Sequence, residues 1–126
     1  MSTESEPKRE SNLDRSTQRM TPAGRRYVGF LAIFNNHNVE RLRTYVQDNF
    51  SEGTLTQISI DTLMDLFERI FRETGGMIVV EADPDGDHKI TLTLKAREHD
   101  TLYIDVMTVD EEFPHKVLSY KHGGVK

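Results

Sequence analysis

A tyrosine and a carboxylate are the residues of this chain whose types suggest acid–base chemistry. Abstraction of a proton next to a carbonyl needs a positioned carboxylate and a donor for the oxyanion that develops. Tyr27 is a candidate donor, with a core aromatic whose hydroxyl lies at the rim as the alternative. Asp105 is a candidate acid, but it alternates with Ile104 and Val106, and it faces away from the helices if these aliphatic residues face toward them. We therefore expect Asp105 in a charge pair on the outer face of a sheet, and the catalytic residues stay unidentified.

One acidic stretch resembles the start of a calcium loop. Asp83, Asp85 and Asp87 alternate as in an EF-hand, but Gly86 comes one place too early and Leu94 stands at the twelfth position, where a bidentate acid is needed. A polar hairpin turn is the prediction for this stretch.

The histidines give a second candidate for metal binding. None of the five pairs with another at metal-ligand spacing, although His88, His115 and the acids at 110–112 can gather at one end of a sheet. A surface acidic cluster is favoured there over a metal site. The sequence therefore predicts no metal and no cofactor.

Composition excludes several classes of function. The chain has 126 residues and no cysteine, which excludes thiol nucleophiles, zinc–thiolate sites and iron–sulfur clusters. Its net charge of −5, without a basic stripe, argues against nucleic acid and against membrane surfaces as partners. No apolar run reaches the roughly 20 residues that span a bilayer, and the first residues lack the apolar core of a secretory signal. We expect a cytoplasmic protein with a single domain.

The apolar pattern predicts helices first and strands afterwards. Thr21 and Pro22 are typical of a helix start, and Gly75 with Gly76 is typical of a helix end. The predicted helices are 22–34, 39–50 and 60–74; a short strand is predicted at 54–58; and longer strands are predicted at 77–82, 88–98, 101–109 and 116–121. Residues 1–20 and 122–126 are expected to be flexible ends of one domain at 21–121.

The long second strand of this meander shows the clearest alternation. Ile90, Leu92, Leu94 and Ala96 point to one side and polar residues to the other, which predicts a sheet that is packed on one face. The fold class is therefore α+β, with three helices on a curved antiparallel sheet.

Three short motifs carry a resemblance to a known superfamily. They are the helix junction at 34–42, the stop Thr74-Gly75-Gly76-Met77, and Phe113-Pro114-His115-Lys116-Val117. Between Pro22 and Tyr120 the chain resembles the nuclear-transport-factor-two-like superfamily, which includes SnoaL-like and ketosteroid-isomerase-like proteins. It is most similar to accessory domains fused to serine hydrolases. The resemblance implies a cone-shaped α+β barrel with a small apolar pocket at its open end.

If the cone is present, four aromatic side chains on the helices are the pocket-lining candidates: Tyr27, Phe30, Phe67 and Phe71. The outer face of the sheet is the candidate homodimer interface, formed by Thr93, Lys95, Tyr103, Asp105 and Met107.

Two functions follow from these expectations. The first is a non-catalytic binding or accessory module for a protein partner or a small apolar ligand. The alternative is a small isomerase, cyclase or hydratase that acts on an apolar carbonyl compound. A buried carboxylate beside a tyrosine or histidine in a connected pocket favours the enzyme.

Overall fold

The computed structural model describes residues 20–124, which fold into four helices followed by a four-stranded antiparallel sheet. The elements are α2 (Pro22–Asn35), α3 (Val39–Asn49), α4 (Glu52–Gln57), α5 (Ile60–Thr74), β1 (Met77–Pro84), β2 (Lys89–Ala96), β3 (Leu102–Val109) and β4 (Val117–Gly124). The predicted α+β class is confirmed. The sheet is open and does not close into a barrel. The predicted flexible tail lies outside the described residues except for Met20.

Polar caps fix where the helices begin. The Thr21 hydroxyl accepts a hydrogen bond from Gly24 N at 3.0 Å, and Pro22 occupies the first helical position. Asn38 caps α3 through Arg41 N at 3.1 Å. Gly75 ends α5 with φ of 70°, a left-handed conformation that glycine adopts without steric cost. The predicted starts of α2, α3 and α5 and the predicted end of α5 are confirmed, and the predicted ends of α2 and α3 are each off by one residue.

The stretch predicted as a strand at 54–58 lies mostly in α4, so that prediction is wrong. Ser51 accepts a hydrogen bond from Thr54 N at 3.1 Å, which starts a helix despite the β-branched residues that follow. The Thr54 hydroxyl also donates to Leu118 O at 2.9 Å and ties α4 to β4. Capping and this tertiary contact outweigh local strand propensity.

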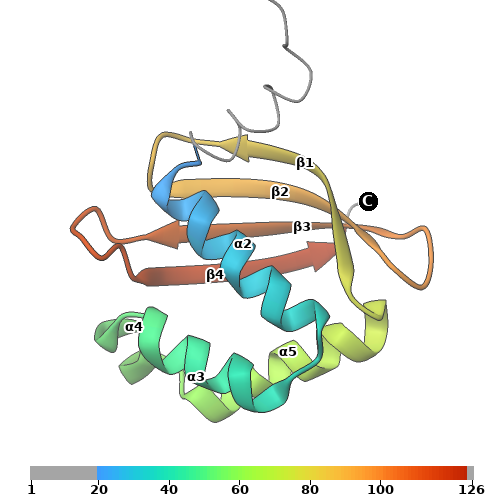
Figure 1. Ribbon diagram of the computed structural model, residues 1–126, viewed down its shortest axis with the longest axis horizontal. Helices are drawn as coiled ribbons and strands as arrows, with labels where there is room; N and C mark the ends of the chain where they lie inside the picture. The colour runs from blue at the N-terminus through green and yellow to red at the C-terminus, as the bar shows by residue number, and fades with distance from the viewer. Residues whose placement is uncertain (1–19, 125–126) are drawn as a thin grey trace, which may run out of the picture.

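The strands follow one another across the sheet in the order β1-β2-β3-β4, as Figure 1 shows. Ile90, Leu92, Leu94 and Ala96 of β2 are all buried, so the predicted alternation of this strand is confirmed. The last strand runs to Gly124, beyond the predicted end at residue 121, because His122 to Gly124 pair with β3. The predicted end of this strand at residue 121 is therefore three residues too early.

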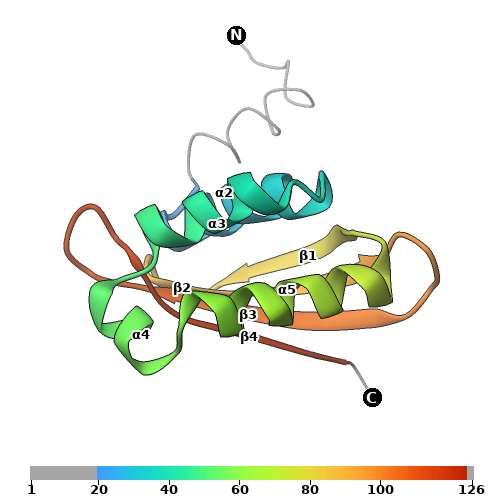
Figure 2. The ribbon, with the colours of Figure 1, turned by 90° about the horizontal axis from the view of Figure 1, so that it is seen from below.

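Helices cover one face of the sheet. Figure 2 shows α2 and α3 together on one side of the sheet, and Figure 1 shows α4 and α5 beyond the edge strand β4. The core is formed between these layers by aromatic and aliphatic side chains, with Tyr27, Phe30 and Phe67 at most 1% exposed. No helix within residues 20–124 is long and apolar enough to cross a bilayer.

An asparagine joins the end of α2 to the start of β1. Asn35 Nδ2 donates to Met77 O at 2.9 Å, and Met77 N donates to Asn35 Oδ1 at 2.8 Å. The side-chain amide thus bonds both backbone groups of Met77 as a neighbouring strand would. This pair anchors the first strand to the helical layer.

Candidate functional site

Three hydrogen-bond donors converge on the carboxylate of Asp105, which is 0% exposed. The hydroxyls of Tyr27 and Tyr120 donate to Oδ2 at 2.7 and 2.8 Å. Nδ1 of His122 lies 2.6 Å from Oδ1. Burial of a carboxylate is costly unless its oxygens accept hydrogen bonds, and these three contacts meet that requirement.

The elements that carry these residues fix their geometry. Tyr27 lies on the face of α2 that packs on the sheet. In the β3–β4 ladder Asp105 is the direct partner of His122, and Met107 is the partner of Tyr120. Direct partners point to the same face, so the ladder brings the residues from β3 and β4 together beneath α2.

The predicted orientation of β3 is wrong. Tyr103, Asp105 and Met107 are buried against the helices, whereas Leu102 is 38% exposed. Asp105 pairs with Leu92 of β2, whose side chain faces the core, and therefore faces the core as well. Both alternating sets of β3 contain apolar residues, so alternation alone does not show which face of this strand is buried.

Both tyrosines stay protonated at neutral pH. Burial raises the pKa of Tyr27 well above its usual value of 10.0, and the Asp105 charge and hydrogen bond raise it further. The pKa of Tyr120 is also raised well above 10.0. Burial is the largest cause, followed by the charge of Asp105 and by Tyr27. Each hydroxyl hydrogen is thus directed to Asp105. The predicted role of Tyr27 as a donor to a substrate does not fit this arrangement, because its hydroxyl hydrogen is already donated to Asp105.

His122 has one ring nitrogen without a partner. Its side chain is 10% exposed, and its Nε2 is buried with no hydrogen-bond partner among the described residues. Tyr103 stacks on the imidazole, with ring centroids 5.0 Å apart and planes 19° apart. A buried polar atom without a hydrogen bond lowers the stability of the fold by about 1–3 kcal/mol. Nε2 is therefore the atom of this site that a bound group could satisfy.

Three of the four pocket-lining candidates fill the space they were expected to line. The Phe30 ring centroid lies 5.6 Å from that of Tyr27, 5.0 Å from that of Phe67 and 5.4 Å from that of Tyr120. These side chains therefore form a packed aromatic cluster between α2, α5 and β4. His122 lies two residues beyond Tyr120 on the same face of β4.

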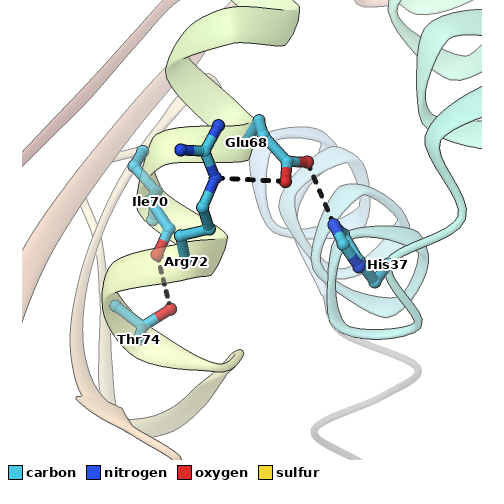
Figure 3. A network of polar contacts seen from close by, with 5 residues as sticks. All are labelled: His37, Glu68, Ile70, Arg72 and Thr74. Carbon is cyan, nitrogen blue, oxygen red and sulfur yellow. Dashed lines mark hydrogen bonds and ion pairs between the residues drawn. The ribbon is translucent and has the colours of Figure 1, made fainter.

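The fourth candidate, Phe71, belongs to another part of the molecule. His37 stacks on it with ring centroids 3.9 Å apart, and Figure 3 shows Glu68 between His37 and Arg72. A groove of about 250 Å³ lies here between the α2–α3 junction and α5, and both Phe67 and Phe71 line it. The hydrogen bond from His37 lowers the pKa of Glu68 more than burial raises it.

The acidic and histidine residues of the loops gather at one end of the sheet. His88 and the acids 110–112 line a hollow of about 530 Å³ together with Asp85 and Asp87. The ring of His115 lies 5.5 Å from that of His88. Within residues 20–124 no group of three or more histidines and acids is arranged to hold a metal ion.

The outer face of the sheet has a different composition from the predicted one. Thr93 and Lys95 lie there as expected, half-buried, and Lys95 Nζ is 3.5 Å from Asp100 Oδ1. Tyr103, Asp105 and Met107 do not, because they face the helices. Their places are taken by Leu102, Ile104 and Val106. This face is consequently more apolar than predicted.

Comparisons of the chain with protein-family models, with curated proteins and with solved structures give no match in any of the three.

Sequence reasoning missed two residues of the site, Tyr120 and His122. Their spacing of two places them on one face of a strand, and that signal was present in the sequence. Only the register of β4 against β3 shows that this face is the one that holds Asp105.

Proposed function

We propose that this protein is a binding module of the nuclear-transport-factor-two-like type that takes a small, largely apolar molecule at the inner face of its sheet. Helices packed on an antiparallel sheet support this assignment, together with the short motifs by which the sequence resembles that superfamily. The ligand site lies around His122, at the end of β4 and beside Tyr103.

The observation that carries the proposal is the free Nε2 of His122. The atom is buried, belongs to a ring that stacks on Tyr103, and has no partner within the described residues, although every other side-chain polar atom of the Asp105 group is hydrogen-bonded. A ligand with one polar group and an apolar body satisfies such an atom.

A thermal-shift screen tests this proposal, with steroid-like and polyketide-like compounds as probes. A ligand that binds only the folded state raises the melting temperature by mass action. The shift is expected for the parent protein and for His88→Ala, which changes a histidine of the distant loop hollow. It is expected to be reduced in His122→Ala. If no compound shifts the parent protein even at high concentration, the proposal is wrong.

The pairing of Asp105 with His122 favours a second candidate, a small isomerase, cyclase or hydratase. With Nδ1 donating to Asp105, Nε2 of a neutral imidazole is a base. In an isomerisation it takes a proton from the carbon beside a ketone, Asp105 stabilises the imidazolium, and the same proton returns to another carbon of the substrate.

Isomerisation of a β,γ-unsaturated steroid ketone, followed by ultraviolet absorbance, tests the enzymatic candidate. General-base catalysis contributes about 10²–10⁴-fold, so His122→Gln is expected to remove most of the rate while His88→Gln retains it. A parent protein that gives no rate above buffer rules out this activity for that substrate class.

We also propose that a second copy of the chain covers the outer face of the sheet. Leu102 and Ile78 are 38% and 49% exposed there, and Ile104 and Val106, which follow Leu102 on the same face of β3, are half-buried. An apolar surface without a covering element is typical of an interaction site.

A further inference from the structure

We propose that two copies of the chain pack outer face to outer face about a two-fold axis parallel to their strands, so that Asp83 of each copy pairs with Lys121 of the other. This inference rests on the proposed contact of a second copy with the outer face and names its arrangement. It follows from two opposite charges that lie at opposite edges of the sheet in one cross-strand row.

The row that carries these charges crosses all four strands. From β1 to β4 its direct partners are Asp83, Thr91, Val106 and Lys121. Thr91 and Val106 alternate with buried residues of their strands, and direct partners point to the same face, so the whole row lies on the outer face. Asp83 and Lys121 are exposed at its two ends. The row is therefore acidic at one edge and basic at the other.

The neighbouring row adds a second acid to the β1 edge. From β1 to β4 its direct partners are Glu81, Thr93, Ile104 and Gly123. Glu81 is exposed, and Gly123 at the opposite end has no side chain. The β4 edge thus leaves room beside its lysine for the acidic β1 edge of a second copy.

Two-fold symmetry allows two ways to align the strands of facing sheets. An axis parallel to the strands places β1 of one copy over β4 of the other, whereas an axis across the strands places each edge over its own counterpart. In the first arrangement Asp83 lies over Lys121, and symmetry repeats this pair. In the second the two acidic edges face each other. Charge complementarity therefore favours the axis parallel to the strands.

The centre of the face suits the same arrangement. With the axis between β2 and β3, Thr93 lies over Ile104 of the second copy, and both side chains are half-buried in the single chain. In the next row Lys95 lies over Leu102 of the second copy. Lys95 Nζ is 3.5 Å from Asp100 Oδ1 of its own chain, so the aliphatic stem covers apolar surface while the charge stays at the rim.

The area of the face makes the edge charges important. Its four strands of eight residues, at about 3.3 Å per residue and about 4.8 Å apart, cover about 500 Å² per copy. The total of about 1,000 Å² lies at the lower limit for a specific interface. Such a dimer has modest affinity, so attraction or repulsion at its two edges changes the fraction of dimer measurably.

Charge reversal at each edge tests the arrangement. Asp83→Lys and Lys121→Glu each replace both attractive pairs by repulsive ones, so each variant should dimerise about tenfold more weakly than the parent in sedimentation equilibrium. The double variant Asp83→Lys/Lys121→Glu restores both pairs and should return to the parent affinity. Asp48→Lys and Arg41→Glu make matched changes at exposed positions of α3, on the helical side of the sheet, and should dimerise as the parent does.

Cross-linking shows directly which edges meet, because the chain has no cysteine of its own. A mixture of Asp83→Cys with Lys121→Cys should give a covalent dimer with a short bismaleimide, since facing sheets lie about 10 Å apart. Either variant alone should give much less, because each position then meets the opposite edge and not its own copy. A mixture of Asp48→Cys with Arg41→Cys is the control for random collision and should give no dimer.

The outcomes separate this arrangement from the proposed contact itself. Single charge reversals that dimerise as tightly as the parent, or a cross-link of Asp83→Cys with itself as strong as that of the mixture, overturn the arrangement and leave a second copy at the outer face. A parent protein that stays monomeric at high concentration overturns both. The thermal-shift screen measures the proposed ligand binding independently of either result.

Discussion

Asp105 and His122 are direct partners in the β3–β4 ladder, and the carboxylate oxygen Oδ1 lies 2.6 Å from Nδ1 of the imidazole. The backbone pairing and the side-chain contact thus fix the same register. A slip of β4 by one residue moves both Tyr120 and His122 to the outer face and leaves a buried carboxylate without two of its three donors. The polar group that forms the candidate site therefore also specifies how the last strand pairs.

Replacement of Asp105 by leucine should strongly destabilise the fold. The change keeps the branched shape of the side chain, although leucine is larger, and it leaves the hydroxyls of Tyr27 and Tyr120 and the Nδ1 of His122 without their acceptor. We expect a loss of about 3–5 kcal/mol in the free energy of unfolding, measured by urea denaturation. Asp100→Leu, at an exposed turn position, should change it by less than about 0.5 kcal/mol. A loss below about 1 kcal/mol for Asp105→Leu contradicts the described network.

Stability should fall at alkaline pH through the buried tyrosines. The pKa values of Tyr27 and Tyr120 are raised in the folded state, so the unfolded state loses these protons first as the pH passes 10.0. Their stabilising effect is fully present below pH 10.0 and is lost as the pH rises toward the folded-state pKa. Each tyrosine contributes a slope of about −1.4 kcal/mol per pH unit in that range.

Urea denaturation between pH 8 and 11 measures this effect. The double variant Tyr27→Phe/Tyr120→Phe should be less stable at pH 8, and its stability should decline less steeply above pH 10. Tyr45→Phe is a graded comparison: burial raises the pKa of Tyr45 and Arg26 offsets part of this rise, so this variant should change the slope less than the double variant does. Equal slopes for the parent and the double variant show that the two hydroxyls are not buried as described.

Removal of the Asn35 side chain should weaken the connection between α2 and β1. Asn35→Ala loses both hydrogen bonds to Met77 and leaves two partly buried backbone groups without partners. We expect a loss of about 1–3 kcal/mol in the free energy of unfolding. Hydrogen exchange at the Met77 amide should become faster. The neighbouring Asn36→Ala, at an exposed position, is the control, and an equal loss in both variants argues against a specific role for Asn35.

A charge on the outer face of the sheet should prevent association of two copies. Ile104→Glu places a carboxylate among Leu102, Val106 and Thr93, where a second copy is proposed to pack. Sedimentation velocity should show a dimer for the parent protein and a monomer for this variant. Val28→Glu changes an exposed aliphatic residue on α2 and should leave the dimer intact. A parent protein that stays monomeric at high concentration contradicts the proposed interface.

The helices illustrate how much local sequence determines. Thr21 caps α2 as predicted, and Asn38 and Ser59 cap α3 and α5, because a cap depends on contacts within four residues. The exception is α4, where Ser51 and the contact of Thr54 with β4 outweigh the strand preference of 54–58.

The two central strands differ in what their sequences reveal. In β2 one alternating set is apolar and the other polar, so the period of two identified the buried face. In β3 both sets are mixed: Leu102, Ile104 and Val106 look more like a core than Tyr103, Asp105 and Met107 do, yet they face outward. Asp105 pairs with Leu92, whose side chain is buried, and this pairing identifies the inner face of β3.

The sequence by itself thus determined the α+β class, most helix limits and the buried face of β2, because these depend on neighbouring residues and on periodicity. The tertiary structure alone decided that Asp105 is an interior residue, because its donors lie 78 residues away on α2 and 15 and 17 residues away on β4. A carboxylate is excluded from a core by the cost of desolvation unless donors meet it there. Only the assembled fold brings those donors to one point, and with them the free nitrogen of His122.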